Sequence, residues 1–153
     1  MEATSERHAL VRVDGDERKG RHVVATQAIS AGTVVATITG HREIAAANRF
    51  SVQVGADTHI DDLGVFTYLN HSCAPNCFFD TTALTLTALE AIEAGDELSF
   101  FYPSTEWEMA EPFDCHCGAA ACVGVIAGAA PLADDVLARY QVNRHIGDLR
   151  SNR

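Results

Sequence analysis

The stretch Tyr68–Asn76, with the core Asn70-His71-Ser72-Cys73-Ala74-Pro75-Asn76, concentrates polar, titratable and metal-binding groups between apolar alternating segments. Asn, His and Ser side chains provide hydrogen-bond donors and acceptors at close quarters. Pro75 fixes its own φ and disfavours helical backbone at Ala74, so the sequence predicts a shaped turn here. The alternative is a polar loop with an Asn-capped turn, and the other cysteines of the chain bear on that choice.

Three more cysteines lie close together in Cys115-His116-Cys117-Gly118-Ala119-Ala120-Ala121-Cys122. Thiolates at this spacing on a Gly/Ala-rich loop suit tetrahedral zinc, which takes four ligands in a structural site. The fourth ligand must come from elsewhere in the chain, and the candidates are Cys73, Cys77, His116 and His71. The alternative is a group of reduced, buried thiols.

Length and composition predict a single globular domain with its own core. The chain has 153 residues, of which 47% are hydrophobic and 21% charged. A net charge of −10 argues against direct binding to nucleic acid and favours a basic partner, such as a Lys/Arg-rich peptide. The alternative is that the acidity serves solubility alone. The sequence makes no prediction of oligomeric state.

The sequence shows neither a membrane-spanning run nor the pattern of a secretion signal. No apolar run approaches the roughly 20 residues that span a bilayer, so we expect no membrane partner. Met1–Glu6 has neither a basic region nor an apolar core of the kind found in secretion signals. We therefore expect a cytoplasmic protein with reduced thiols, or a nuclear one if its substrate is chromatin.

Many short segments rich in β-branched or alternating residues predict a mostly β domain. The expected strands are His8–Val13, Arg21–Thr26, Thr33–Thr39, Phe50–Val54, Cys77–Asp80, Ala83–Leu89 and Glu97–Tyr102. Arg42–Asn48 is expected to form a helical turn at most, Asp61–Leu69 is ambiguous, and Asp14–Gly20 is a charged turn. Helical spacing over Pro131–Asp148 predicts the one substantial helix.

A weak internal repeat is also present. Ala28-Ile29-Ser30-Ala31-Gly32 resembles Ala91-Ile92-Glu93-Ala94-Gly95, and each precedes an expected strand. The repeat indicates that the same tight turn is used twice.

Together, three motifs resemble a SET-domain protein-lysine methyltransferase with a post-SET zinc loop. They are Asn70–Asn76, the segment Gly95-Asp96-Glu97-Leu98-Ser99-Phe100-Phe101-Tyr102, and the Cys115/Cys117/Cys122 cluster, in the order and spacing of that family. Lys19–Gly40 also looks like the opening segment of the family. The resemblance covers about residues 8–124.

The resemblance implies the SET fold, in which several small curved sheets surround a C-terminal pseudoknot. Such threading is an exception to the usual rule for protein chains. The implied divisions are a SET domain at residues 8–112, a zinc-binding post-SET loop at 113–124 and a C-terminal helical extension at 125–153.

The resemblance also implies two bound groups, S-adenosylmethionine as cofactor and a structural Zn²⁺. The residues it implies for cofactor binding are Arg21, His22, Val23, Asn70, His71, Tyr102 and His116. Those implied for zinc are Cys73, Cys115, Cys117 and Cys122. Tyr102 would be the catalytic residue, and Phe79, Phe100 and Phe113 would line the substrate channel. For Phe79 and Phe100 the alternative is plain core packing.

The function implied by the resemblance is methyl transfer to the side-chain amine of a lysine in a basic protein or peptide. The amine must be neutral to attack, and desolvation in an apolar channel lowers its pKa. The chain departs from the family pattern at His22, Ile38, Thr67 and Phe101, where Gly, Tyr, Arg and Asp are usual. The alternatives are a catalytically degenerate SET-fold binding module, or a methyltransferase for a small-molecule amine.

Overall fold

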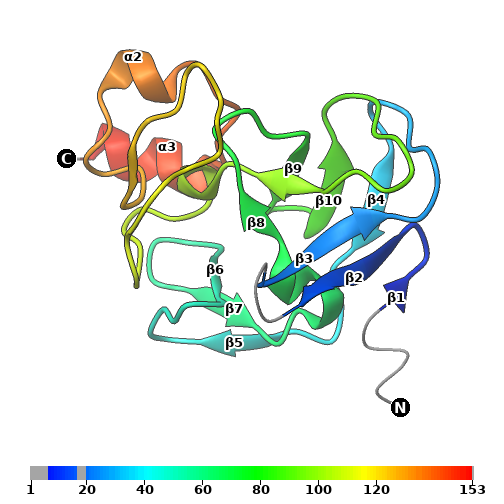
Figure 1. Cartoon of the computed structure of the whole chain (residues 1–153). Coiled ribbons are helices and arrows are strands. Elements are labelled where there is room, and N and C mark those ends of the chain that lie inside the picture. Colours follow the sequence, from blue (N-terminus) through cyan, green and yellow to red (C-terminus); the bar gives the residue numbers. More distant parts are fainter. Residues whose placement is uncertain (1–6, 17–19, 153) are drawn as a thin grey trace.

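The computed structural model describes residues 7–16 and 20–152, so the tip of the predicted charged turn lies outside the described residues. The strands of the described residues form five small sheets. Figure 1 shows how the labelled strands are arranged, and residues of four of the sheets share the main core. Three of the sheets have three strands: β1 (Arg7–His8), β2 (Val11–Asp16) and β3 (Gly20–Ala25); β4 (Val34–Thr37), β10 (Thr85–Ala88) and β9 (Cys77–Asp80); β5 (Arg42–Ile44), β7 (His59–Asp61) and β6 (Val52–Gln53). Two have two strands: β8 (Asn70–His71) with β11 (Ser99–Phe100), and β12 (Phe113–Asp114) with β13 (Val125–Ile126).

The mostly β prediction is confirmed, and the strand Cys77–Asp80 is found with the predicted bounds. The prediction for Arg42–Asn48 is wrong, because Arg42–Ile44 pairs with β7 as a strand. The Arg42 guanidinium donates two hydrogen bonds, of 3.1 and 3.0 Å, to the Asp61 carboxylate across that pair. The ambiguous segment contains a short 3₁₀ helix, η1 (Gly64–Tyr68).

The two repeated turns pair with each other. Ile29 and Ile92 exchange two backbone hydrogen bonds of 2.8 Å, and both side chains are buried. Gly32 and Gly95 end the turns with φ values of +85° and +89°, which glycine adopts without steric cost. The repeated sequence therefore corresponds to two turns that pair with each other in the core.

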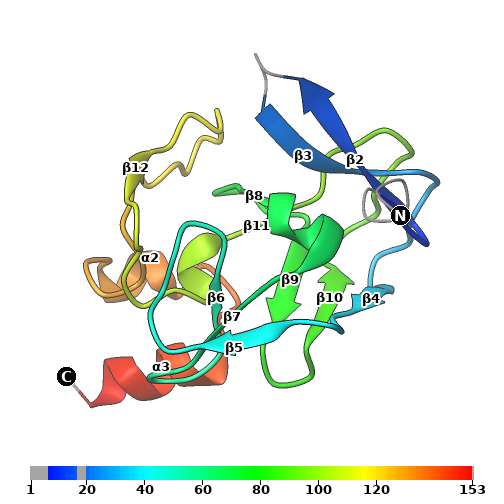
Figure 2. The same ribbon diagram turned by 90° about the horizontal axis from the view of Figure 1, so that it is seen from below.

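The parallel pair β8–β11 brings two distant motifs together. The Asn76 side chain holds the second motif in place, donating to the carbonyl of Glu97 at 2.8 Å and accepting from the Ser99 N–H at 2.9 Å. Figure 2 shows β8 and β11 adjacent, near the centre of the molecule. Because of this pairing, Asn70 and His71 lie next to the residues that follow Phe100.

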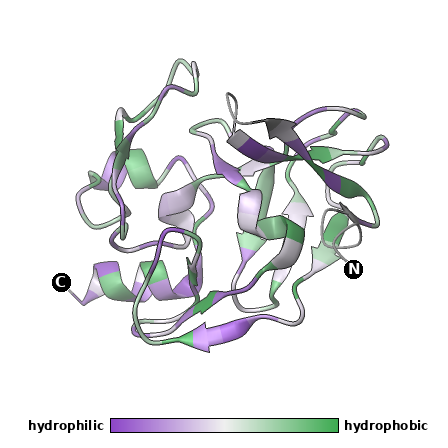
Figure 3. Cartoon of the chain, turned by 60° about the horizontal axis from the view of Figure 1, so that its bottom comes forward, coloured by the Kyte–Doolittle hydropathy of each residue, from purple (hydrophilic) through white to green (hydrophobic). Residues whose placement is uncertain are grey.

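The predicted helix over Pro131–Asp148 is wrong. The structure has a short helix α2 (Asp134–Leu137), an irregular link, and then helix α3 (Arg144–Ser151). The link is irregular because the side chains of Tyr140 and Asn143 form hydrogen bonds with other segments of the chain. Hydrophobic and hydrophilic positions alternate along α3, near the label C in Figure 3, and His145 and Ile146 are its buried residues.

The C-terminal segment packs on a second, smaller apolar cluster. Its buried members are Phe101, Ala129, Leu137 and Ile146. In Figures 1 and 2, α2 and α3 lie on the side of the molecule away from β1–β3. Within the described residues, no helix has both the length and the apolar character needed to cross a membrane.

Asn143 is expected to be the most costly polar side chain to remove from this segment. It is buried, its Oδ1 accepts from the Thr81 N–H at 2.9 Å, and its Nδ2 donates to the carbonyls of Phe79 and Ser104 at 2.8 and 3.0 Å. Asn143→Ala removes all three side-chain hydrogen bonds, at a cost of about 3 kcal/mol, or roughly 10 °C in Tm. Thermal denaturation measures the shift, with the exposed Asn152→Ala as control. Equal Tm values for the two variants would contradict this account.

Candidate active site

A cavity of about 690 Å³ opens between the central strands and two loops, which is a typical size for a small-molecule site. Its wall comes from five stretches of chain: Gly20–Arg21, residues 48–52, residues 63–71, Phe100–Glu106 and residues 109–113. Residues of the segment Lys19–Gly40, of the motif Asn70–Asn76 and of the motif Gly95–Tyr102 thus meet at one cavity.

Tyr102 lies on the cavity wall. Its O–H donates a hydrogen bond of 2.6 Å to the carbonyl of Leu69, which fixes the direction of the hydroxyl. Its ring lies 4.9 Å from Phe100, 5.4 Å from His71 and 6.0 Å from Phe113, measured between ring centroids. Burial, helped by nearby carboxylates, raises the pKa of Tyr102, so its phenol is neutral.

His71 is held by the backbone of the same tyrosine. The Tyr102 N–H donates to His71 Nδ1 at 3.1 Å, and His71 Nε2 lies 3.2 Å from the Cys73 Sγ atom. Burial lowers the pKa of His71 to about 4, which leaves the ring neutral with Nδ1 as an acceptor. His71 therefore links the cavity to the cysteine cluster.

The other residues predicted to bind a cofactor differ in their placement. Asn70 and Arg21 line the cavity; Asn70 Nδ2 donates to Glu97 Oε2 at 2.9 Å, and the Arg21 guanidinium lies over the Tyr68 ring. His22 and Val23 follow along β3 but are absent from the described cavity wall, and Val23 is fully buried. His116 is exposed on the loop that carries the cysteines.

Of the three aromatic residues predicted for a channel, Phe100 and Phe113 line the cavity. Phe79 is fully buried behind Phe100, with ring centroids 5.7 Å apart, and is not on the described cavity wall. Ile38, at the position where the family pattern has a Tyr, is buried in the main core. The cavity therefore has no side chain from residue 38.

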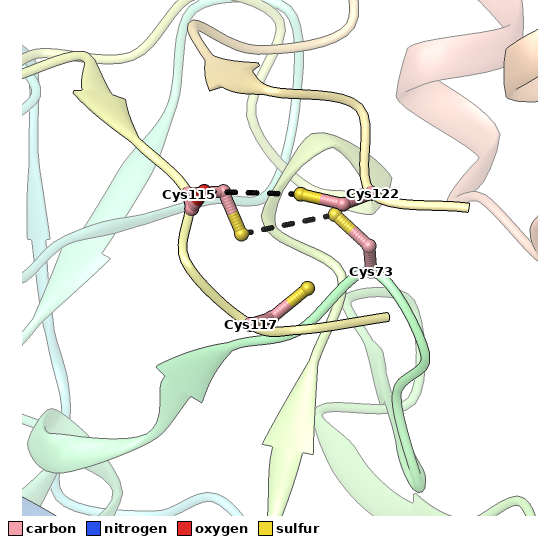
Figure 4. Close-up of side chains that lie close together, drawn as sticks. All are labelled: Cys73, Cys115, Cys117 and Cys122. Carbon is pink, nitrogen blue, oxygen red and sulfur yellow. Dashed lines mark hydrogen bonds between the residues drawn. The ribbon is translucent and has the colours of Figure 1, made fainter. Parts of the chain in front are cut away.

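Four cysteines converge beside the cavity: Cys73, Cys115, Cys117 and Cys122 (Figure 4). Their sulfur atoms all lie within 4.8 Å of one another, and Cys73 Sγ is 3.9 Å from Cys115 Sγ. Four sulfurs at about 2.3 Å from a tetrahedral zinc would be roughly 3.8 Å apart. The cluster therefore fits Zn²⁺, and Cys73 is the ligand that the loop alone does not supply.

The thiols of the cluster differ in acidity. Burial raises the pKa of Cys73 and that of Cys115, whereas a backbone hydrogen bond from Ala119 lowers the pKa of Cys117 to about 6. A bound cation deprotonates thiols outright, so these differences would vanish with zinc in place. Cys77, the remaining cysteine, is buried in the main core and apart from the cluster.

Phe101, at the position where the family pattern has an Asp, points away from the cavity. It stacks on Tyr140 with a centroid distance of 3.6 Å and an interplanar angle of 6°. The Tyr140 O–H donates to the carbonyl of Cys73 at 2.7 Å. The C-terminal segment thereby supports both the strand that leads to Tyr102 and the turn that presents Cys73.

Sequence reasoning missed Glu106, a buried carboxyl group on the cavity wall. Its Oε2 accepts from the Gln53 N–H at 2.9 Å and from Thr105 Oγ1 at 2.6 Å. Burial raises the pKa of Glu106 to about 7. The nearby residues Ser104, Thr105 and Glu108 are typical of an exposed loop, so the sequence pattern gives no sign that Glu106 is buried.

Known proteins resemble this chain in sequence. A model of the SET domain family matches residues 20–103. Methyltransferase flvH of Aspergillus flavus is 40% identical over 124 residues, which are 80% of this chain and 70% of that protein. The H3 lysine-36 specific histone-lysine N-methyltransferase of Chaetomium globosum is 40% identical over 67 residues, which are 40% of this chain and 7% of that protein.

Solved structures resemble it in fold. KRYPTONITE in complex with mCHG DNA and SAH has a TM-score of 0.60 and 25% identity, covering 75% of this chain and 28% of that one. A second KRYPTONITE structure, with mCHH DNA, an H3(1–15) peptide and SAH, has a TM-score of 0.56 and 25% identity, covering 75% of this chain and 29% of that one.

Proposed function

The chain belongs to the SET-domain family of methyltransferases, and from that membership we propose that it methylates the side-chain amine of a lysine in a basic protein or peptide. S-adenosylmethionine would be the methyl donor. The observation that carries the proposal is the position of Tyr102, whose oriented hydroxyl lies on the wall of the same cavity as Asn70 and His71.

The cofactor would occupy the part of the cavity near β3 and β8. SAH, the product of methyl donation, is bound in the KRYPTONITE structures. S-adenosylmethionine supplies an electrophilic methyl group on a sulfonium. On this chain, Asn70 offers an amide and His71 an aromatic ring at the cavity wall, while Arg21 borders the cavity from β3.

The acceptor amine would reach Tyr102 from the side of residues 48–52 and 109–113. Phe100 and Phe113 provide apolar walls there, which favour the neutral, reactive form of the amine. Tyr102 O–H is already engaged by Leu69, so its lone pairs are left to orient the reacting groups through weak contacts. Most of the rate enhancement would come from alignment in a site that excludes water.

The four-cysteine cluster would hold a structural Zn²⁺. A site with four thiolates has no open coordination position, so it takes no part in the chemistry. Zinc would fasten the loop 113–124 to the turn at Cys73, next to His71. The loop carries Phe113 and would thereby complete the cavity.

A small-molecule amine is the second candidate acceptor. The match with flvH extends over 80% of this chain, whereas the match with the Chaetomium globosum histone enzyme extends over 40%. The name of flvH specifies no acceptor. The KRYPTONITE structure that contains an H3(1–15) peptide supports the peptide acceptor instead, as does the net charge of −10.

A methylation assay with two acceptor panels tests the proposal. Lysine-containing basic peptides are compared with the same peptides carrying Arg for Lys, and with free alkylamines. We expect transfer to the lysine peptides and none to the arginine set. Transfer to free amines alone would favour the small-molecule acceptor, and binding of S-adenosylmethionine without transfer would favour a degenerate module.

A further inference from the structure

Glu106 is a buried carboxyl group that the proposed methyl transfer leaves without a role. The residue is 6% exposed, yet it contributes to the cavity wall four residues after Tyr102. Among the described residues no Lys, Arg or His forms an ion pair with it. A buried carboxylate is normally paired, because leaving water is costly for a charge.

The two oxygens of this carboxyl group are used unequally. Oε2 accepts both hydrogen bonds, one from the Gln53 N–H and one from Thr105 Oγ1, and Oε1 accepts none from the described residues. The backbone of Glu106 is fixed by a 3.0 Å hydrogen bond from its N–H to the carbonyl of Tyr102. Oε1 is therefore the oxygen available to a group in the cavity.

We propose that Glu106 binds the ammonium group of the acceptor through Oε1 and then takes its proton, so that the acceptor is selected as a cationic aliphatic amine. This inference rests on the proposed function for its acceptor. In the proton step an N–H bond breaks and an O–H bond forms on Oε1. The ion pair becomes a neutral amine and a carboxylic acid, with charge conserved.

Two properties of the site support this role. Burial raises the pKa of Glu106 to about 7, which makes the carboxylate a better proton acceptor than an exposed one. The group also lies on the chain segment between Tyr102 and the loop 109–113, where the acceptor would enter. A purely structural tether from Gln53 to Thr105 would need only Oε2.

Glu106→Gln separates the charge from the tether. The glutamine oxygen can still accept from Gln53 and Thr105, but the side chain has no charge and cannot take a proton. The matched control is Glu108→Gln, which removes an exposed carboxylate that is not on the described cavity wall. We expect the acceptor KM of Glu106→Gln to rise at least about tenfold and kcat to fall, with S-adenosylmethionine affinity unchanged.

A binding probe makes the test independent of activity. n-Butylammonium and the uncharged 1-butanol are titrated into the protein with S-adenosylhomocysteine bound. We expect n-butylammonium to bind Glu106→Gln at least about tenfold more weakly than wild type, while 1-butanol binds both alike. Charge-dependent binding without methylation of any amine would refute the proposed function and leave this site standing. Equal n-butylammonium affinity in wild type and Glu106→Gln would overturn the proposed role of Glu106.

Discussion

Tyr102→Phe is expected to lower kcat for methyl transfer at least about 100-fold, which corresponds to roughly 3 kcal/mol of lost transition-state stabilisation. The ring contacts with Phe100, His71 and Phe113 remain in the variant. Only the hydroxyl that is fixed on the carbonyl of Leu69 is removed. The loss should therefore appear chiefly in the chemical step, with a smaller cost in stability because the Leu69 carbonyl loses this partner.

Tyr68→Phe is the matched control for this experiment. The Tyr68 hydroxyl also borders the cavity, where it accepts a long 3.4 Å hydrogen bond from Arg21. We expect kcat to fall no more than severalfold. Single-turnover kinetics and a cofactor titration distinguish chemistry from binding. Equal kcat values for the two variants would remove Tyr102 from the centre of the reaction.

Loss of zinc is the second large effect that we expect. Cys117 is exposed, so Cys117→Ser removes a metal ligand with little loss of packing. Structural zinc contributes about 10–16 kcal/mol in isolated zinc-finger peptides, so loss of the ion should release the loop 113–124. We expect faster hydrogen exchange in that loop and weaker binding of S-adenosylmethionine.

Metal analysis provides the direct readout, with Cys77→Ala as control because Cys77 lies outside the cluster. Wild type and Cys77→Ala should each carry one zinc per chain, and Cys117→Ser should carry much less. A full complement of zinc in Cys117→Ser would exclude this four-cysteine site.

The parts of the fold that sequence predicted are those with local signals. Short alternating segments indicated strands such as Cys77–Asp80, and the two Ala-Ile-x-Ala-Gly turns were visible as a repeat. The cysteine spacing indicated a metal site and left Cys73 among several possible partners. These features depend on residue type and spacing, which the sequence contains.

The features that sequence did not predict depend on contacts between distant residues. Helical periodicity over Pro131–Asp148 ignored Asn143, whose side chain satisfies three backbone groups elsewhere in the fold. Phe101 departs from the family pattern, and its stacking on Tyr140 is visible only in the structure. The sequence around Glu106 suggests an exposed loop, and only the three-dimensional structure shows that its carboxyl group is buried.

The measurement that tests the central claim most directly is mass spectrometry of both products of one reaction. The wild-type protein is incubated with S-adenosylmethionine and a mixed library of basic peptides. We predict methylated lysine side chains and S-adenosylhomocysteine in equal amounts, with both lost in Tyr102→Phe. Intact cofactor and unmodified peptides, under conditions in which S-adenosylmethionine is bound, would contradict the assignment of a peptide-lysine methyltransferase.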